Sequence, residues 1–116
     1  MSAKRRRWAV RLTAAAEADF EQIVRWTAEQ FGARQAQAYA RTMSLAIEAL
    51  SQGPEVLGVT ARDDIAPGLR SLHVARGGRK GRHLVFFRAR SADETAVIEV
   101  LRVLHDAMDL PRHLEP

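Results

Sequence analysis

The sequence predicts an α+β fold in which one sheet, made of an N-terminal strand and a three-stranded antiparallel meander, packs against an antiparallel helical hairpin. Two segments with apolar residues at helical spacing, separated by one glycine, occupy residues 13–53. Three strand-like segments occupy residues 69–104, and a short segment in which apolar side chains alternate precedes the helices. With 47% apolar and 28% charged residues, a chain of 116 residues can bury one core. We therefore expect residues 1–116 to form one domain, with residues 1–7 as a flexible basic N-terminus.

The N-terminal strand and the first helix are expected to meet at Thr13. Apolar side chains alternate from Trp8 to Leu12, which is the period of a strand. Thr13 then offers an N-cap hydroxyl, and Glu17 and Asp19 place negative charge near the helix start, where the helix dipole favours it. The apolar face of this helix follows steps of three and four: Ala16, Phe20, Ile23, Val24, Thr27 and Phe31.

A second helix follows after Gly32, a residue that can take the left-handed conformation at a helix C-terminus. Gly53 and Pro54 end this helix. Because the connection is so short, the two helices should fold back on each other, and small residues would allow close approach. The apolar face consists of Ala36, Tyr39, Ala40, Met43, Ile47 and Leu50.

The second half of the chain is read as a loop and a three-stranded antiparallel meander that joins the N-terminal strand in one sheet. The loop covers Glu55–Pro67. The last strand is apolar at both odd and even positions, as expected of a central strand covered on both faces. The strands are Leu69–Ala75, Arg82–Phe87 and Ala96–Leu104, with turns at Arg76–Gly81 and Ser91–Glu94.

Basic charge is concentrated in the meander. The net charge is +4, and arginine supplies 16 of the 18 basic residues. No acidic residue occurs between Ile65 and Ala92, which indicates a surface for nucleic acid or for an acidic protein. Charged edge strands that merely resist aggregation are the alternative. The cations of this window are Arg70, Arg76, Arg79, Lys80, Arg82, Arg88 and Arg90, with His73 and His83 beside them.

Several classes of site are excluded or disfavoured. The absence of cysteine removes disulfides and thiol nucleophiles and favours the cytoplasm, and no membrane span or signal peptide is expected. No Gly-rich phosphate loop, HExxH or GxSxG is present, so we predict no cofactor. His105, Asp109 and His113 have metal-ligand spacing, but Pro111 interrupts the helix they would need, and we predict no metal.

A metal-independent ribonuclease is a sharper catalytic hypothesis. It would need arginines to hold the scissile phosphate and a histidine or tyrosine to transfer a proton. Arg82, Arg88, Arg102 and His105 are residues of the right kind. In the simpler interpretation, Arg102 and His105 are strand-end residues paired with nearby acids or backbone carbonyls, because nothing in the spacing requires the four to converge.

Three segments resemble the ParE toxins of the RelE/ParE superfamily. These are "VRLTAAAEADFEQIVRWTAEQFG", "GRHLVFFR" and "VIEVLRVLHDAMDLPRHL", and the similarity extends from about Trp8 to Leu114. The resemblance implies a RelE/ParE-like fold and the toxic half of a bacterial type II toxin–antitoxin module. It implies neutralisation by a ParD-like antitoxin with an acidic C-terminal segment, in a hetero-oligomer. In ParE-like members the implied target is DNA gyrase, and in RelE-like members it is ribosome-bound messenger RNA.

The departures from the RelE pattern favour the ParE branch, in which the toxin is not itself an enzyme. RelE-like nucleases carry an arginine just before the core of the middle strand, where this chain has His83, and Arg82 should point to the other face. The single tyrosine, Tyr39, lies in the second helix. Two alternatives remain open: an mRNA interferase using Arg82, Arg88 and His105, or a domain that only binds its partner. The predicted surface for antitoxin or target consists of Arg70, Arg82, Arg88 and Arg90.

Overall fold

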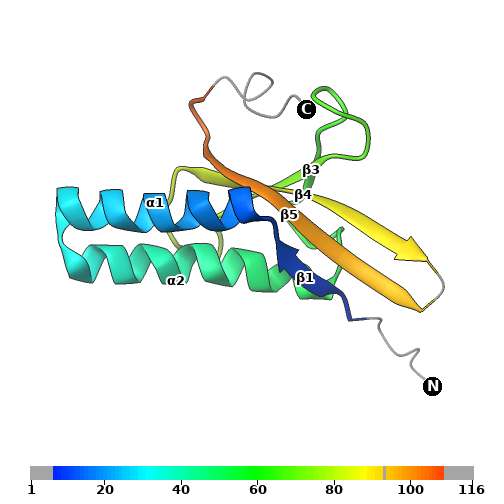
Figure 1. The fold of residues 1–116 in the computed structure, drawn as a ribbon, viewed down its shortest axis with the longest axis horizontal. Helices are drawn as coiled ribbons and strands as arrows, with labels where there is room; N and C mark the ends of the chain where they lie inside the picture. The colour runs from blue at the N-terminus through cyan, green and yellow to red at the C-terminus, as the bar shows by residue number, and fades with distance from the viewer. Residues whose placement is uncertain (1–6, 93, 109–116) are drawn as a thin grey trace.

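A computed structural model describes residues 7–92 and 94–108, with two helices packed on one five-stranded sheet (Figure 1). The sheet order is β1-β5-β4-β3-β2. Neither helix is long and apolar enough to cross a membrane, within the part of the chain that the structure describes. The elements are β1 (Ala9–Leu12), α1 (Ala14–Phe31), α2 (Ala33–Ala49), the short 3₁₀ helix η1 (Leu50–Gln52), β2 (Thr60–Ala61), β3 (Arg70–His73), β4 (His83–Ala92) and β5 (Thr95–His105).

The helical hairpin forms as the sequence predicts. Thr13 caps α1, with its hydroxyl oxygen accepting from the Ala16 N–H at 3.1 Å. Gly32 joins the helices with φ 92° and ψ 167°. This conformation has the positive φ that was expected but an extended ψ, which differs from the left-handed helical conformation and is accessible essentially to glycine alone. The tip of the hairpin at Gly32 extends well past the sheet, so the last turn of α1 lies away from the core (Figure 1).

The sheet contains the predicted meander and N-terminal strand, with corrected boundaries. β3, β4 and β5 pair antiparallel in sequence order, and β1 runs parallel to β5. The predicted loop holds a two-residue strand, β2, which pairs with β3 and raises the strand number to five. β4 continues past Phe87 to Ala92, because β5 stays paired with it beyond Arg70, the first residue of β3. The far ends of β4 and β5 therefore project from the sheet as a ribbon, which β1 borders along residues 97–100 of β5 (Figure 1).

The main core lies between the helices and one face of the sheet. Alternation places Val85 and Phe87 of β4 on this face, and both are fully buried. They pack with Met43 and Ile47 from α2, two members of the predicted helical face. From α1, Ala16 is buried, whereas the predicted core residue Phe31 is 64% exposed because the hairpin tip lies beyond the sheet.

A smaller cluster covers part of the other face of the sheet. Phe86 and Leu104 are buried there and pack with Leu69, Ile65 and other residues of the segment that precedes β3. A bulge in the β4–β5 pairing between Phe86 and Phe87 shifts the register at this point. β5 is thus a central strand as predicted, and its second face is covered around Leu101 and Leu104 but not along its first half.

Candidate functional site

The predicted arginine surface is divided between the two faces of the sheet. Phe86 and Phe87 contribute to different clusters, so alternation places Arg88 and Arg90 on the face away from the helices. Arg70 is paired with Phe87 in register and points to the helix side, where it donates to the Pro54 carbonyl at 2.9 Å. Arg70 therefore does not share a surface with Arg88 and Arg90.

Arg82 lies at the start of β4 and is held by Asp106. Its guanidinium contacts the Asp106 carboxylate at 3.2 Å, and the same carboxylate lies 3.0 Å from His73 Nε2. His73 Nδ1 accepts from the Ala75 N–H, so the neutral tautomer with a proton on Nε2 satisfies both contacts. The hydrogen bond from His73, together with Arg82, keeps the pKa of Asp106 below its usual value.

A second cluster joins α2 to the strand ends. The Tyr39 hydroxyl accepts from the Arg82 backbone N–H at 3.1 Å and lies 2.6 Å from His83 Nδ1, to which it donates. The ring of His105 meets that of His83 edge-on, with 5.3 Å between centroids. Burial, together with the neighbouring His105, lowers the pKa of His83 to about 4. His83 is consequently neutral at physiological pH and cannot serve as a cationic phosphate ligand.

Arg102 also has a structural partner. Its guanidinium makes two hydrogen bonds to Asp19 of α1, at 2.7 and 2.9 Å, and these raise its pKa. The same Asp19 carboxylate accepts from the Val103 backbone N–H at 2.9 Å. Because β1 ends at Leu12, the edge of β5 that faces away from β4 has no strand partner here, and the Asp19 carboxylate accepts the Val103 N–H that a neighbouring strand would otherwise bind. Sequence reasoning had assigned Asp19 only to the helix dipole.

An aromatic groove, which sequence reasoning missed, lies between α1 and these strand ends. Two adjoining depressions of about 570 and 710 Å³ share Trp26, His83 and His105. Trp26 is 56% exposed and meets Phe31 edge-on at 5.9 Å between ring centroids. Exposed aromatic rings in a concave surface mark an interaction site. The available signal was that Trp26 falls outside the helical face assigned to the core.

Cationic side chains border the aromatic groove. Lys80 and Arg82 line one depression beside Tyr39, and Arg102 lines the other. Met108 lines the second depression and is 43% exposed. The groove thus combines an apolar floor with a basic rim, which suits an amphipathic, acidic segment of another protein.

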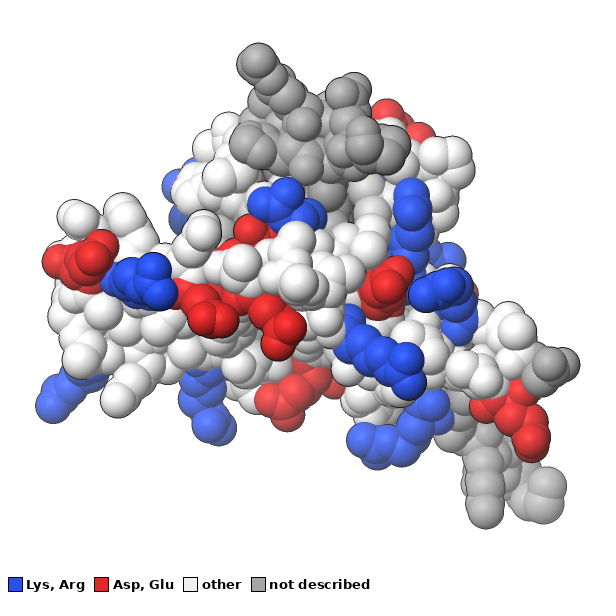
Figure 2. All heavy atoms as spheres, viewed as in Figure 1, with Lys and Arg blue, Asp and Glu red and all other residues white. Residues whose placement is uncertain are grey.

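The opposite end of β4 is open. Arg88 is exposed and makes no hydrogen bond or ion pair with any described residue, and Arg90 is 3.7 Å from Glu99. In Figure 2, most Lys and Arg side chains on the visible face gather around β1 and the projecting ribbon, whereas Asp and Glu follow α1. The ribbon is therefore the part of the predicted basic surface that is most available to a partner.

The residues of the ribonuclease hypothesis are not brought together as a set. Arg82 and His105 both approach Asp106, but Arg88 lies six residues further along β4, about 20 Å away at the rise of a strand. Of the metal-ligand candidates, Asp109 and His113 lie outside the described residues. Among the residues that are described, no three histidine, aspartate or glutamate side chains are grouped to hold a metal ion.

Comparison with known proteins places this arrangement in context. Residues 10–110 match the family described as "ParE toxin of type II toxin-antitoxin system, parDE". Toxin ParE1 of Mycobacterium tuberculosis is 35% identical over 103 residues, which cover 89% of this chain and 94% of that protein. Toxin ParE1 of Caulobacter vibrioides is 32% identical over 104 residues, 90% of this chain and 95% of that protein. A solved chain of the chromosomal ParDE TA system from P. aeruginosa shares the fold, with a TM-score of 0.67 at 21% identity, over 86% of this chain and 97% of that chain.

Proposed function

The chain belongs to the ParE toxin family of type II toxin–antitoxin systems, and from this premise we propose that a cognate antitoxin neutralises it by binding and that its target is DNA gyrase. The observation that carries the antitoxin proposal is the aromatic groove with its basic rim. Burying Trp26 and Phe31 against a partner would remove a large apolar area from water, and Lys80, the rim cation with no carboxylate partner among the described residues, would favour an acidic segment.

Gyrase is favoured over messenger RNA by the state of the candidate catalytic groups. Arg82 is paired with Asp106 and Arg102 with Asp19, so neither guanidinium has its charge available for a phosphate. His83 has a pKa of about 4 and stands where RelE-like nucleases are expected to have an arginine. A protein that acts by binding needs none of these groups to be free.

Purified toxin distinguishes the two targets. We expect dose-dependent inhibition of supercoiling by purified gyrase, and no new codon-phased RNA ends when the toxin is briefly expressed in cells. His105→Ala should retain toxicity, because a binding mechanism does not require its ring nitrogens. Unaffected gyrase together with codon-phased RNA ends, and loss of both toxicity and cleavage in a folded His105→Ala variant, would overturn the gyrase proposal in favour of the interferase.

The antitoxin proposal is tested with the product of a neighbouring gene for a short acidic protein. Trp26→Ala should weaken its binding at least tenfold, as expected of an aromatic hot spot. Arg25→Ala is the matched control, because this exposed neighbour on α1 lines no part of the aromatic groove. Equal affinities for both variants and the wild type would show that the groove is not the antitoxin site.

The four predicted arginines are proposed to contact the antitoxin at separate places rather than as one surface. We propose that Arg88 and Arg90 contact acidic side chains of the antitoxin from the projecting ribbon, with Arg82 at the edge of the aromatic groove. Arg70 remains a proposed contact, reached from the helix side. A structure of the complex in which all four arginines face solvent would refute this set.

A further inference from the structure

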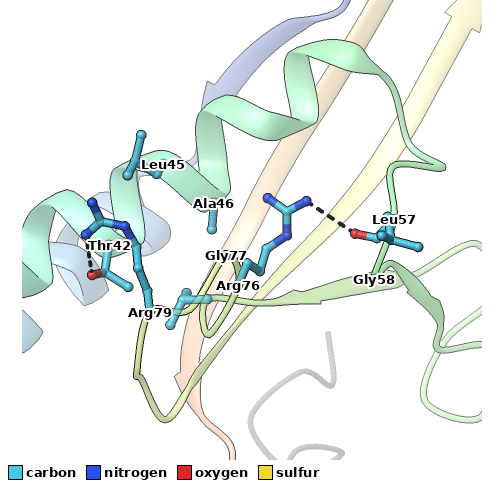
Figure 3. A pocket seen from close by; sticks show the side chains of 9 residues that line it. Thr42, Leu45, Ala46, Leu57, Gly58, Arg76, Gly77 and Arg79 are labelled. Atoms are coloured by element: carbon cyan, nitrogen blue, oxygen red, sulfur yellow. Dashed lines mark hydrogen bonds between the residues drawn. The ribbon is translucent and has the colours of Figure 1, made fainter.

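A third depression lies on the helix side of the molecule, between α2 and the turn that joins β3 to β4 (Figure 3). Its volume is about 560 Å³, and it is separate from the aromatic groove, sharing only Thr42 with it. The proposed function does not use this depression. Its chemistry comes from Arg76 and Arg79 on one side and from apolar residues of α2 and the loop before β2 on the other.

The turn sequence Arg-Gly-Gly-Arg sets the spacing of the two arginines. The Arg79 N–H donates to the Arg76 carbonyl at 3.0 Å, which closes a β-turn with Arg76 and Arg79 at its ends. Gly77 and Gly78 occupy the central positions with φ 58° and 80°, values that side chains rarely adopt. The ends of such a turn lie within about 7 Å of each other, so both arginine side chains start from the same edge of the depression.

Each guanidinium is fixed at a wall of the depression. Arg79 donates to the Thr42 hydroxyl at 3.2 Å and Arg76 to the Leu57 carbonyl at 3.3 Å (Figure 3). Both acceptors are neutral, and neither arginine has a carboxylate partner among the described residues. A guanidinium carries five N–H donors, so each side chain is oriented by one bond and keeps donors for a ligand.

The remaining wall is apolar. Leu45, Ala46 and Val74 line it, and Val74 is fully buried at its base. Leu57 lines the depression and is 90% exposed, the most exposed large apolar side chain among the described residues. The depression therefore offers two cations and an apolar contact side by side, and this combination favours a protein segment over nucleic acid, whose phosphates are attached to polar sugars.

We propose that this Arg76–Arg79 pocket binds a carboxylate and an adjacent apolar side chain of an acidic protein segment. The inference rests on the proposed function, since the antitoxin is the partner of that chemistry, and it assigns a second anchoring point to the same partner. Arg76, on the side of Leu57, binds an Asp or Glu side chain of the partner whose aliphatic neighbour covers Leu57, and Arg79 adds a second cation on the side of α2.

The test measures the affinity of the neighbouring gene's acidic protein for two matched double variants. Arg76→Gln with Arg79→Gln should weaken binding at least tenfold. Arg25→Gln with Arg34→Gln removes the same charge from exposed positions on α1 and α2 and should weaken binding less than twofold. Equal losses for the two pairs would mean that only net charge matters, and the pocket would be rejected.

Two further variants guard against a trivial effect on folding. Leu57→Ser changes a side chain that is 90% exposed, so the fold should survive and binding should fall about fivefold. Replacing both arginines by lysine keeps the charge but loses the planar fork, and should recover only part of the affinity. Unchanged binding of folded Leu57→Ser, or full recovery with lysine, contradicts the proposal.

The outcome also separates this inference from the proposed function. If the acidic protein binds the wild type and the Arg76→Gln, Arg79→Gln variant equally, the pocket fails while antitoxin binding stands. If it binds neither, both fail. If a single-stranded 20-nucleotide DNA or RNA loses affinity for the variant while the acidic protein does not, the pocket is a nucleic-acid site and the proposal is wrong.

Discussion

The two ends of β4 use the same residue type for different purposes. At the first end, Arg82 just before β4 and Arg102 on the adjoining strand are each bound to a carboxylate, and a partly buried tyrosine–histidine contact lies beside them. At the far end, Arg88 has no partner among the described residues, and Arg90 reaches Glu99 only at 3.7 Å. Sequence reasoning treated these arginines as one surface.

The difference shows that clustering of cations along a sequence does not by itself identify a binding surface. Where the chain supplies a carboxylate from another element, as Asp19 does from α1, the arginine stabilises the fold. Where β4 and β5 project beyond the helices (Figure 1), no described residue pairs with the Arg88 side chain, and this cation is left for a partner. Four predictions test this division.

The largest effect is expected for Asp19→Ala at the structured end. The substitution leaves Arg102 without its carboxylate and the Val103 N–H without its acceptor. We expect a loss of about 2 to 3 kcal/mol in the free energy of unfolding, measured by urea denaturation. Glu21→Ala, an exposed carboxylate on the same helix, should change it by less than about 0.5 kcal/mol. Similar losses for the two variants would remove the structural role given to Asp19.

Gly81→Ala should disturb the same end by crowding. An added Cβ would lie 2.5 Å from Val74 Cγ2 and 3.0 Å from the Tyr39 hydroxyl oxygen. Because Val74 is buried, the neighbours must shift. We expect the free energy of unfolding to fall by about 1 to 3 kcal/mol, measured by thermal unfolding. Lys80→Ala, at the exposed neighbouring position, serves as the control. Unchanged stability of Gly81→Ala would indicate that this end is more loosely packed than described.

His83 gives the structured end a dependence on pH. Its pKa is about 4 in the folded protein and about 6.5 when unfolded, so the unfolded state takes up a proton first as the pH falls. Stability should fall between about pH 6.5 and pH 4, by about 1 kcal/mol after allowing for the partly exposed ring. His83→Gln lacks this contribution, and the difference between the two unfolding curves across pH isolates it. If the stabilities of the wild type and His83→Gln changed in parallel with pH, His83 would not be a neutral, partly buried group in the folded protein.

The smallest effect on stability is expected at the far end. Arg88→Gln with Arg90→Gln should change the free energy of unfolding by less than about 0.5 kcal/mol, because the only partner lost among the described residues is a long surface contact to Glu99. The same variant should bind the acidic partner several-fold more weakly, measured by calorimetry at low salt. A loss of stability without a loss of affinity would show that Arg88 and Arg90 stabilise the fold and do not bind the partner.

Local patterns were sufficient for the elements and the main core. The steps of three and four found the buried faces of both helices, and Thr13 and Gly32 were correctly placed at the helix ends. β2 escaped notice because a strand of two residues has no measurable period. Phe31 was assigned to the core by its spacing, but spacing does not tell how far a helix extends past the sheet that covers it.

By itself, the sequence determined the family, the order of the elements and the concentration of cations in the meander, because these depend on residue type and on short-range spacing. Only the tertiary structure decided which cations are paired. Asp19 and Arg102 are 83 positions apart, and Arg82 and Asp106 are 24 apart. Such partners are chosen by how the strands register and where the helices pack, and no local pattern carries that information.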